Sequence, residues 1–172
     1  RQKTHYEKLA QEIPILKIKD SYLYIPRLVS IIPAYVESMW LQDGTVRAAN
    51  AGYWYWTWDA LQTGFGFLQW GQHEKTKSIL QFVNKVKQED GRLMMNYLHD
   101  FQPLQSEVLG LGGDLLVPKL LWAYFNFTGD LSTVRQLYKH SKQIFLGVAR
   151  KCNKSGFYPI TGIFPDYKEE FG

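Results

Sequence analysis

Residues 114–151 read DLLVPKLLWAYFNFTGDLSTVRQLYKHSKQIFLGVARK, and they contain two helical patterns separated by one glycine, Gly129. The first part is apolar almost throughout, which predicts a buried helix over 114–128. The second part repeats apolar residues every three or four positions with basic and polar residues between them, which predicts an amphipathic helix over 131–151. A glycine that follows a helix often ends it in a left-handed conformation. These residues therefore predict a helical hairpin with one buried and one half-exposed helix.

The same order of elements occurs once earlier in the chain. The sequence predicts a buried helix over about 58–70, a turn at Gly71 and an amphipathic helix over 73–87. Gly71 and Gly129 lie 58 residues apart, which gives the period of the repeat. Helical hairpins that repeat in this way stack side by side, because each one cannot cover its own apolar face. The predicted fold class is therefore all-α, built from stacked helical hairpins.

The repeat also suggests how the chain is organised. A closed ring of six such hairpins would need about 350 residues at this period, and the chain has 172. Because the first residue is Arg1 and not Met, we expect these residues to form part of a larger protein. The predicted parts of one toroid domain over 1–172 are an entry helix in 1–40, a first full hairpin in 41–88, a second in 89–151 and a loop towards a further hairpin in 152–172.

Composition and charge exclude several function classes. The 20 basic and 16 acidic residues are spread along the chain, so no nucleic-acid-binding patch is expected. The apolar runs are far shorter than the roughly 18 residues of a membrane helix, so no membrane partner is expected. The single cysteine, Cys152, excludes an internal disulfide and a cysteine metal site. The sequence also lacks a glycine-rich phosphate loop, and we expect neither a cofactor nor a metal. The absence of a signal peptide from these residues favours the cytoplasm.

The densest chemical pattern is NAGYWYWTWDA at residues 50–60, where five rings fall in the six positions 53–58 and an aspartate follows. One interpretation is structural, with Asp59 or Thr57 capping a helix and the rings packed in the core. The other is a sugar subsite, since sugar C–H faces stack on aromatic rings and a carboxylate accepts hydrogen bonds from hydroxyl groups. The predicted substrate-binding residues of this segment are Tyr53, Trp56, Trp58 and Asp59.

Two further loops carry acidic residues. The loop before the second buried helix contains His99 and Asp100, and Asp114 follows a pair of glycines at the start of that helix. We predict Asp100 and Asp114 as further substrate contacts, although a solvated turn and a helix cap are structural alternatives for them. Asp166 lies in the last loop and is the candidate general acid, with a solvated tail as its alternative.

Residues 52–61, GYWYWTWDAL, together with Gly64-Phe65 and Gly71-Gln72, resemble the six-hairpin (α/α)6 glycosidases. That family includes the processing α-glucosidases, trehalases, glucoamylases and bacterial glycogen-debranching glucosidases. The segment 114–124 and the turn 128–130, TGD, resemble the next hairpin of the family. The resemblance extends from about Trp40 onward and implies that the chain forms about half of an (α/α)6 toroid.

The resemblance implies an inverting glycoside hydrolase that acts on α-linked glucosides or related sugars. In such enzymes a carboxylic acid protonates the leaving oxygen, and a carboxylate about 6.5–9.5 Å away activates water. By resemblance, Asp59 holds the sugar in the cleavage subsite and Trp56 and Trp58 form its wall. The debranching and glucoamylase branches carry arginine where this chain has Trp58. The family's catalytic base belongs to the other half of the ring, so we expect no turnover by these residues alone.

Two other function classes remain open. Sugar epimerases share the toroid but use histidine pairs near its axis. We expect His73 and His140 to face outward, so only His99 is well placed for such a role. A non-catalytic helical-repeat module that binds a glycan or peptide would use the same hairpins. An incomplete ring would also leave an apolar edge open, so we expect self-association through it.

Overall fold

The computed structural model describes residues 32, 34–41, 44–46, 55–94, 96–97, 111–152, 154 and 156. The chain divides into two compact units, residues 1–40 and residues 41–172. In the first unit, residues 34–39 are helical. The elements discussed below all belong to the second unit.

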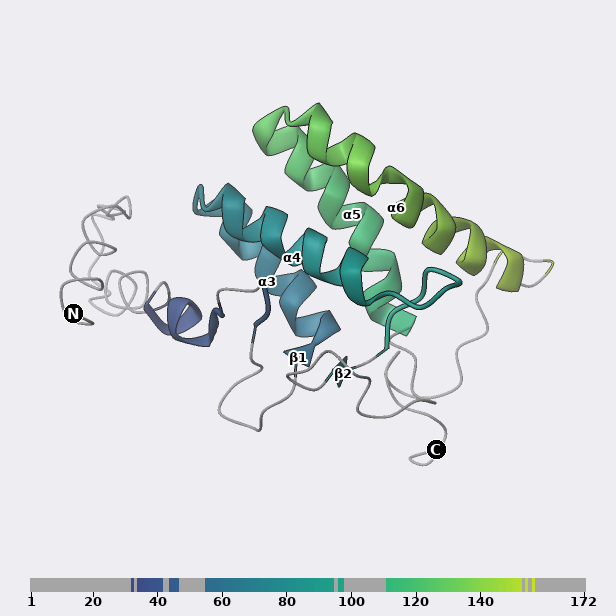
Figure 1. Ribbon diagram of the computed structural model, residues 1–172, viewed down its shortest axis with the longest axis horizontal. Coiled ribbons are helices and arrows are strands. Elements are labelled where there is room, and N and C mark those ends of the chain that lie inside the picture. Colours follow the sequence, from purple (N-terminus) through teal and green to yellow (C-terminus); the bar gives the residue numbers. More distant parts are fainter. Residues whose placement is uncertain are drawn as a thin grey trace, which may run out of the picture. The chain divides into compact units, whose positions relative to one another are not determined.

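Four helices dominate the second unit (Figure 1), and the predicted all-α class is confirmed. They are α3 (Thr57–Gln69), α4 (His73–Val86), α5 (Leu111–Thr128) and α6 (Leu131–Lys151). Each begins and ends within about one turn of its predicted position. Gly71 and Gly129 have φ values of 73° and 68°, which confirms the left-handed turns between the paired helices. None of the described helices is long and apolar enough to cross a membrane.

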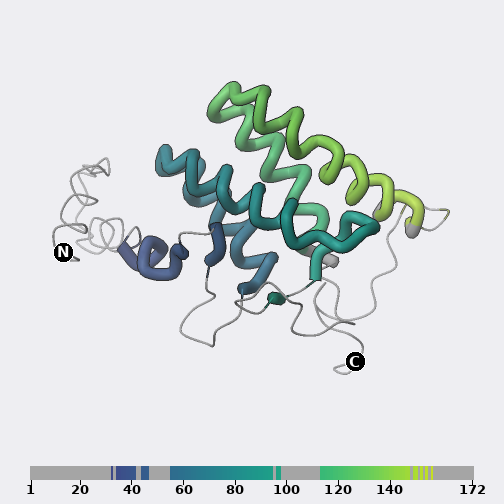
Figure 2. Tube along the Cα trace, viewed as in Figure 1, coloured from purple at the N-terminus to yellow at the C-terminus, as the bar shows by residue number. Residues whose placement is uncertain are grey.

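The two hairpins α3–α4 and α5–α6 lie side by side (Figure 2). Helix α3 packs against α4 and α5, α5 packs against α6, and α4 contacts both helices of the second hairpin. The close approach of α3 to α5 depends on Gly64, because a Cβ atom there would lie 2.7 Å from Cδ2 of Leu120. The core lies between the helices and includes Leu61 of α3 and Ile79 of α4.

Asp130 ties the two hairpins together at the turn between α5 and α6. Its Oδ1 accepts the Thr133 backbone N–H at 3.0 Å, which caps α6. Its Oδ2 accepts the hydroxyl groups of Thr133 at 2.6 Å and Tyr124 at 3.0 Å, and the Lys77 ammonium of α4 at 3.3 Å. These donors, the Thr133 hydroxyl and N–H foremost, hold the pKa of Asp130 well below its usual value.

The outward orientation expected for His140 is wrong. His140 is only 2% exposed, and its Nε2 donates a hydrogen bond to the Gly91 carbonyl at 2.9 Å. Burial lowers the pKa of the imidazole to about 4. The sequence pattern around this residue is polar, with Lys139 and Ser141 as neighbours. His140 lies three residues after buried Leu137 and four before buried Ile144, so it shares their face of α6, and the turn after α4 covers it at Gly91.

Candidate functional site

A short two-stranded sheet joins the aromatic segment to the loop that follows α4. Strand β1 (Tyr55–Trp56) pairs antiparallel with β2 (Asn96–Tyr97), with Tyr55 opposite Tyr97 and Trp56 opposite Asn96. Segments that are far apart in the chain therefore meet directly at the start of α3.

Among the described rings of this segment, Tyr55 belongs to the core. Tyr55 is buried and contacts Phe82 edge-on, with ring centroids 6.1 Å apart, and Phe82 contacts Tyr97 in the same way at 6.4 Å. The Tyr97 hydroxyl accepts the Met94 N–H at 3.0 Å and donates to the Val86 carbonyl at 2.9 Å. This aromatic cluster packs the sheet against α4. Tyr55 is therefore a core residue, as the structural interpretation of the aromatic segment predicts.

Neither Thr57 nor Asp59 is the N-cap residue of α3. Trp56 occupies the N-cap position of α3, and no side-chain capping bond occurs there among the described residues. The Thr57 hydroxyl instead donates to the Met94 carbonyl at 2.9 Å and so ties α3 to the loop before β2. Asp59 lies in the first turn of α3, where a negative charge interacts favourably with the helix dipole.

Asp59, Trp56 and Trp58 are all half-buried at the start of α3. Burial raises the pKa of the Asp59 carboxyl above its ordinary value, and a hydrogen bond from its own backbone N–H opposes this shift in part. A carboxyl in such a setting, next to partly accessible indole rings, can hydrogen-bond to hydroxyl groups of a ligand while the rings contact its apolar faces.

Asp114 occupies a different environment. It is 1% exposed, and its Oδ1 accepts the Leu93 backbone N–H at 2.7 Å. Neighbouring Gly113 packs against α3, since a Cβ atom there would lie 3.4 Å from Oγ1 of Thr57. In this position Asp114 anchors the loop after α4 to the start of α5, which is a role in folding. The structure does not bring it to an accessible surface beside Asp59.

Four other candidates, Tyr53, His99, Asp100 and Asp166, lie outside the described residues. Within the described part of the chain, no three His, Cys, Asp or Glu residues gather in a way that could hold a metal ion.

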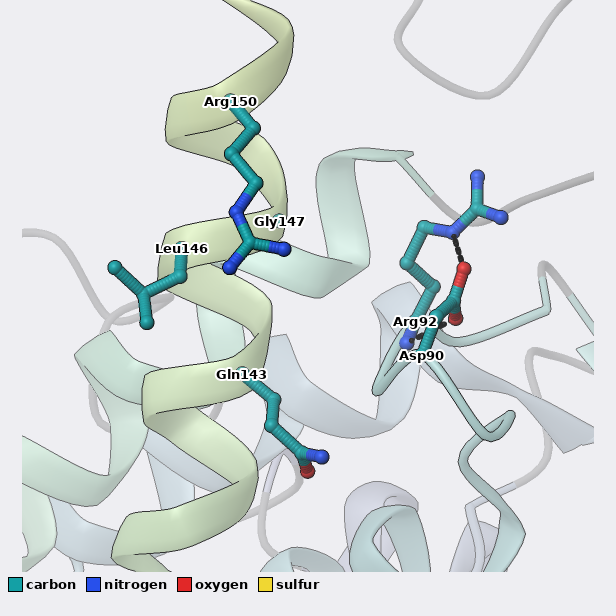
Figure 3. A pocket seen from close by; sticks show the side chains of 6 residues that line it. All are labelled: Asp90, Arg92, Gln143, Leu146, Gly147 and Arg150. Carbon is teal, nitrogen blue, oxygen red and sulfur yellow. Dashed lines mark hydrogen bonds and ion pairs between the residues drawn. The ribbon is translucent and has the colours of Figure 1, made fainter.

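An open pocket of about 380 Å³ lies between the turn before β2 and the second half of α6 (Figure 3). It is lined by Asp90, Arg92, Gln143, Leu146, Gly147 and Arg150. Figure 3 shows that Arg92 turns towards Asp90, and its Nε donates to Oδ2 of that residue. The pocket contains no residue of the aromatic segment. Sequence reasoning missed it, because its residues come from separate elements and form no motif.

No protein-family model, no curated protein and no solved structure matches the chain. The carbohydrate interpretation therefore depends on the residues at the start of α3 and on the repeated hairpins.

Proposed function

We propose that this chain is the sugar-binding front half of a six-hairpin glycosidase, and that it recognises α-linked glucosides at the start of α3. The observation that carries the proposal is that Asp59, Trp56 and Trp58 are all half-buried at the start of α3. Asp59 accepts hydrogen bonds from vicinal sugar hydroxyls, and the indoles contact the C–H faces. The sheet formed by β1 and β2 holds this end of the helix in place.

The stacking of the two hairpins supports the toroidal part of the proposal. Helices α3 and α5 contact each other and each has its own outer partner, which is the order that an (α/α) ring repeats. In this proposal Asp166 remains the candidate general acid, and the base belongs to the other half of the ring. We expect no sustained hydrolysis of glucosides by these 172 residues.

The epimerase alternative gains no support from the described histidines. His140 is buried against the Gly91 carbonyl, and the His73 ring packs edge-on against Phe127 with centroids 6.3 Å apart. Neither is placed as one of a pair beside Asp59. A non-catalytic glycan-binding module would bind sugar through the same residues. It would differ from the proposed glycosidase in lacking the rest of the ring.

The test is a titration of tryptophan fluorescence with maltose, with the β-linked cellobiose for comparison. We expect weak, saturable quenching by maltose and at least a tenfold loss of affinity in Asp59→Asn, since hydrogen bonds to a charged group contribute about 1.5–3 kcal/mol. The matched control is Glu74→Gln, which removes the carboxylate in the first turn of α4 and should bind as the unaltered chain does. Equal binding of both sugars, or unchanged binding by Asp59→Asn with its circular dichroism intact, contradicts the proposal.

A further inference from the structure

The pocket between the turn after α4 and the second half of α6 (Figure 3) has no part in the proposed sugar site. Two of its lining residues, Asp90 and Arg92, belong to the turn. The others lie three or four positions apart and so share one face of α6, namely Gln143, Leu146, Gly147 and Arg150. The volume of about 380 Å³ lies in the range of small-molecule sites.

Hydrogen bonds hold the turn in a defined shape against α6. The Gln88 N–H donates to the Arg92 carbonyl at 2.8 Å, and the Gly91 N–H donates to the Gln88 carbonyl at 2.9 Å. Gly91 has a φ of 88° and lies so close to α6 that a Cβ atom there would be 2.9 Å from Cβ of Gln143. From the same helix, Nε2 of His140 donates to the Gly91 carbonyl. This wall of the pocket is therefore formed before a ligand binds, which lowers the cost of ordering it.

The wall formed by α6 is open at Gly147. A Cβ atom there would meet nothing within 4 Å, so no neighbour among the described residues requires a glycine at this position. Glycine is also less favourable than alanine inside a helix. The missing side chain leaves the helix surface open to the pocket, and Figure 3 shows the Arg150 side chain running back along α6 towards Gly147. A ligand can therefore lie against α6 within reach of Arg150.

Two guanidinium groups give the pocket a positive charge. Arg92 pairs with Asp90 through Nε, and no other described residue binds its guanidinium, so both Nη atoms can donate to a ligand. Arg150 is exposed and forms no ion pair within the described part of the chain. The lining residues thus keep a positive charge after the Asp90 carboxylate is counted. A guanidinium group binds the oxygen atoms of phosphates and carboxylates with paired hydrogen bonds, so the pocket suits an anion.

The arrangement favours a phosphate group over a carboxylate. Arg92 and Arg150 belong to different walls of the pocket, and a tetrahedral phosphate presents oxygen atoms to both, whereas one guanidinium already satisfies a planar carboxylate. The pocket also has room for more than a phosphate group. The Gln143 amide and the Asp90 carboxylate can form hydrogen bonds with hydroxyl groups in the remaining space.

We propose that this pocket binds a phosphate monoester of a small hydroxylated molecule. Arg92 and Arg150 hold the phosphate group, and Gln143 contacts the organic part, which lies over Gly147. The proposal does not depend on sugar binding at the start of α3, because the two sites share no residue.

The test is a titration of the full chain with glycerol 3-phosphate, followed by NMR at constant ionic strength so that screening does not change. We expect the Gly147 amide signal and the Nε–H signals of Arg92 and Arg150 to shift together and to saturate with one affinity. Glycerol should cause no shift, and acetate should bind about tenfold more weakly, since it can pair with only one guanidinium. Inorganic phosphate should also bind more weakly, because it makes no contact with Gln143. The absence of a saturable shift, equal binding of acetate, or tighter binding of inorganic phosphate overturns the proposal.

Two variants distinguish this site from a general attraction of anions to a basic helix. Arg150→Gln should lower the affinity for glycerol 3-phosphate about tenfold, because it removes a charge-assisted pair of hydrogen bonds. The matched control is Arg135→Gln, which removes an exposed arginine of the same helix outside the pocket and should leave the affinity unchanged. Gly147→Leu should abolish binding with the helix intact, because leucine favours a helix more than glycine does and fills the open side of the pocket. Equal affinities of the two arginine variants, or undiminished binding by Gly147→Leu, overturns the proposal.

Discussion

At the scale of single residues, buried His140 makes the stability of the fold depend on pH. Its pKa is about 4 in the folded chain and about 6.5 in an unfolded one, so the unfolded state binds more protons between these values. The free energy of unfolding therefore falls as the pH drops from 6.5 to 4, by at most about 3 kcal/mol from this group at about 1.36 kcal/mol per pKa unit.

Urea unfolding at pH 7, 6 and 5 measures this effect in His140→Gln, whose amide can still donate to the Gly91 carbonyl. We expect the variant to lose less stability on acidification than the unaltered chain. The matched control is His73→Gln, which removes a half-exposed histidine. If the pH profiles of His140→Gln and the unaltered chain are parallel, the pKa of His140 is the same in the folded and the unfolded state, which contradicts the prediction.

At the scale of elements, Gly64 and Gly66 give opposite predictions within one helix. A Cβ atom on Gly64 would meet the buried Leu120 side chain, whereas one on Gly66 meets nothing within 4 Å. Gly66→Ala should raise the free energy of unfolding by up to about 1 kcal/mol through helix propensity. Gly64→Ala gains the same propensity but overpacks the contact with α5, which costs about 1–3 kcal/mol. The free energies of unfolding of the two variants, measured in urea, should therefore differ by about 1–3 kcal/mol. Equal values would mean that α3 and α5 are not in close contact at Gly64.

The helices themselves were predictable from the sequence, because a buried helix, a glycine and an amphipathic helix occur twice in the same order. The contacts between them were not. Nothing in the pattern around Gly64 says that Leu120 meets it, and nothing around Asp114 says that its carboxylate binds the Leu93 N–H. Composition likewise could not show that Tyr55 is buried while Trp58 is only half-buried. Tyr55 belongs to β1, and its position depends on the pairing of β1 with β2.

At the scale of the whole second unit, the network around Asp130 makes the two hairpins depend on each other. Asp130 caps α6, binds Tyr124 of α5 and pairs with Lys77 of α4, so one side chain contacts both hairpins. Stacked repeats are stabilised by such interfaces between neighbours. Loss of the carboxylate in Asp130→Asn should therefore loosen the first hairpin as well as the second, although the residue lies in the second alone.

Hydrogen exchange resolved along the chain tests this coupling. We expect Asp130→Asn to speed exchange in α4 and in the first turns of α6, because the variant keeps a shape close to that of aspartate but loses the charge that Lys77 and the Thr133 donors stabilise. Asp90→Asn, which alters an exposed carboxylate in the turn after α4, is the matched control and should leave both regions nearly unchanged. Faster exchange confined to α6 would mean that Asp130 acts only as a helix cap, and that the packing of α3 and α4 against the second hairpin couples the hairpins without it.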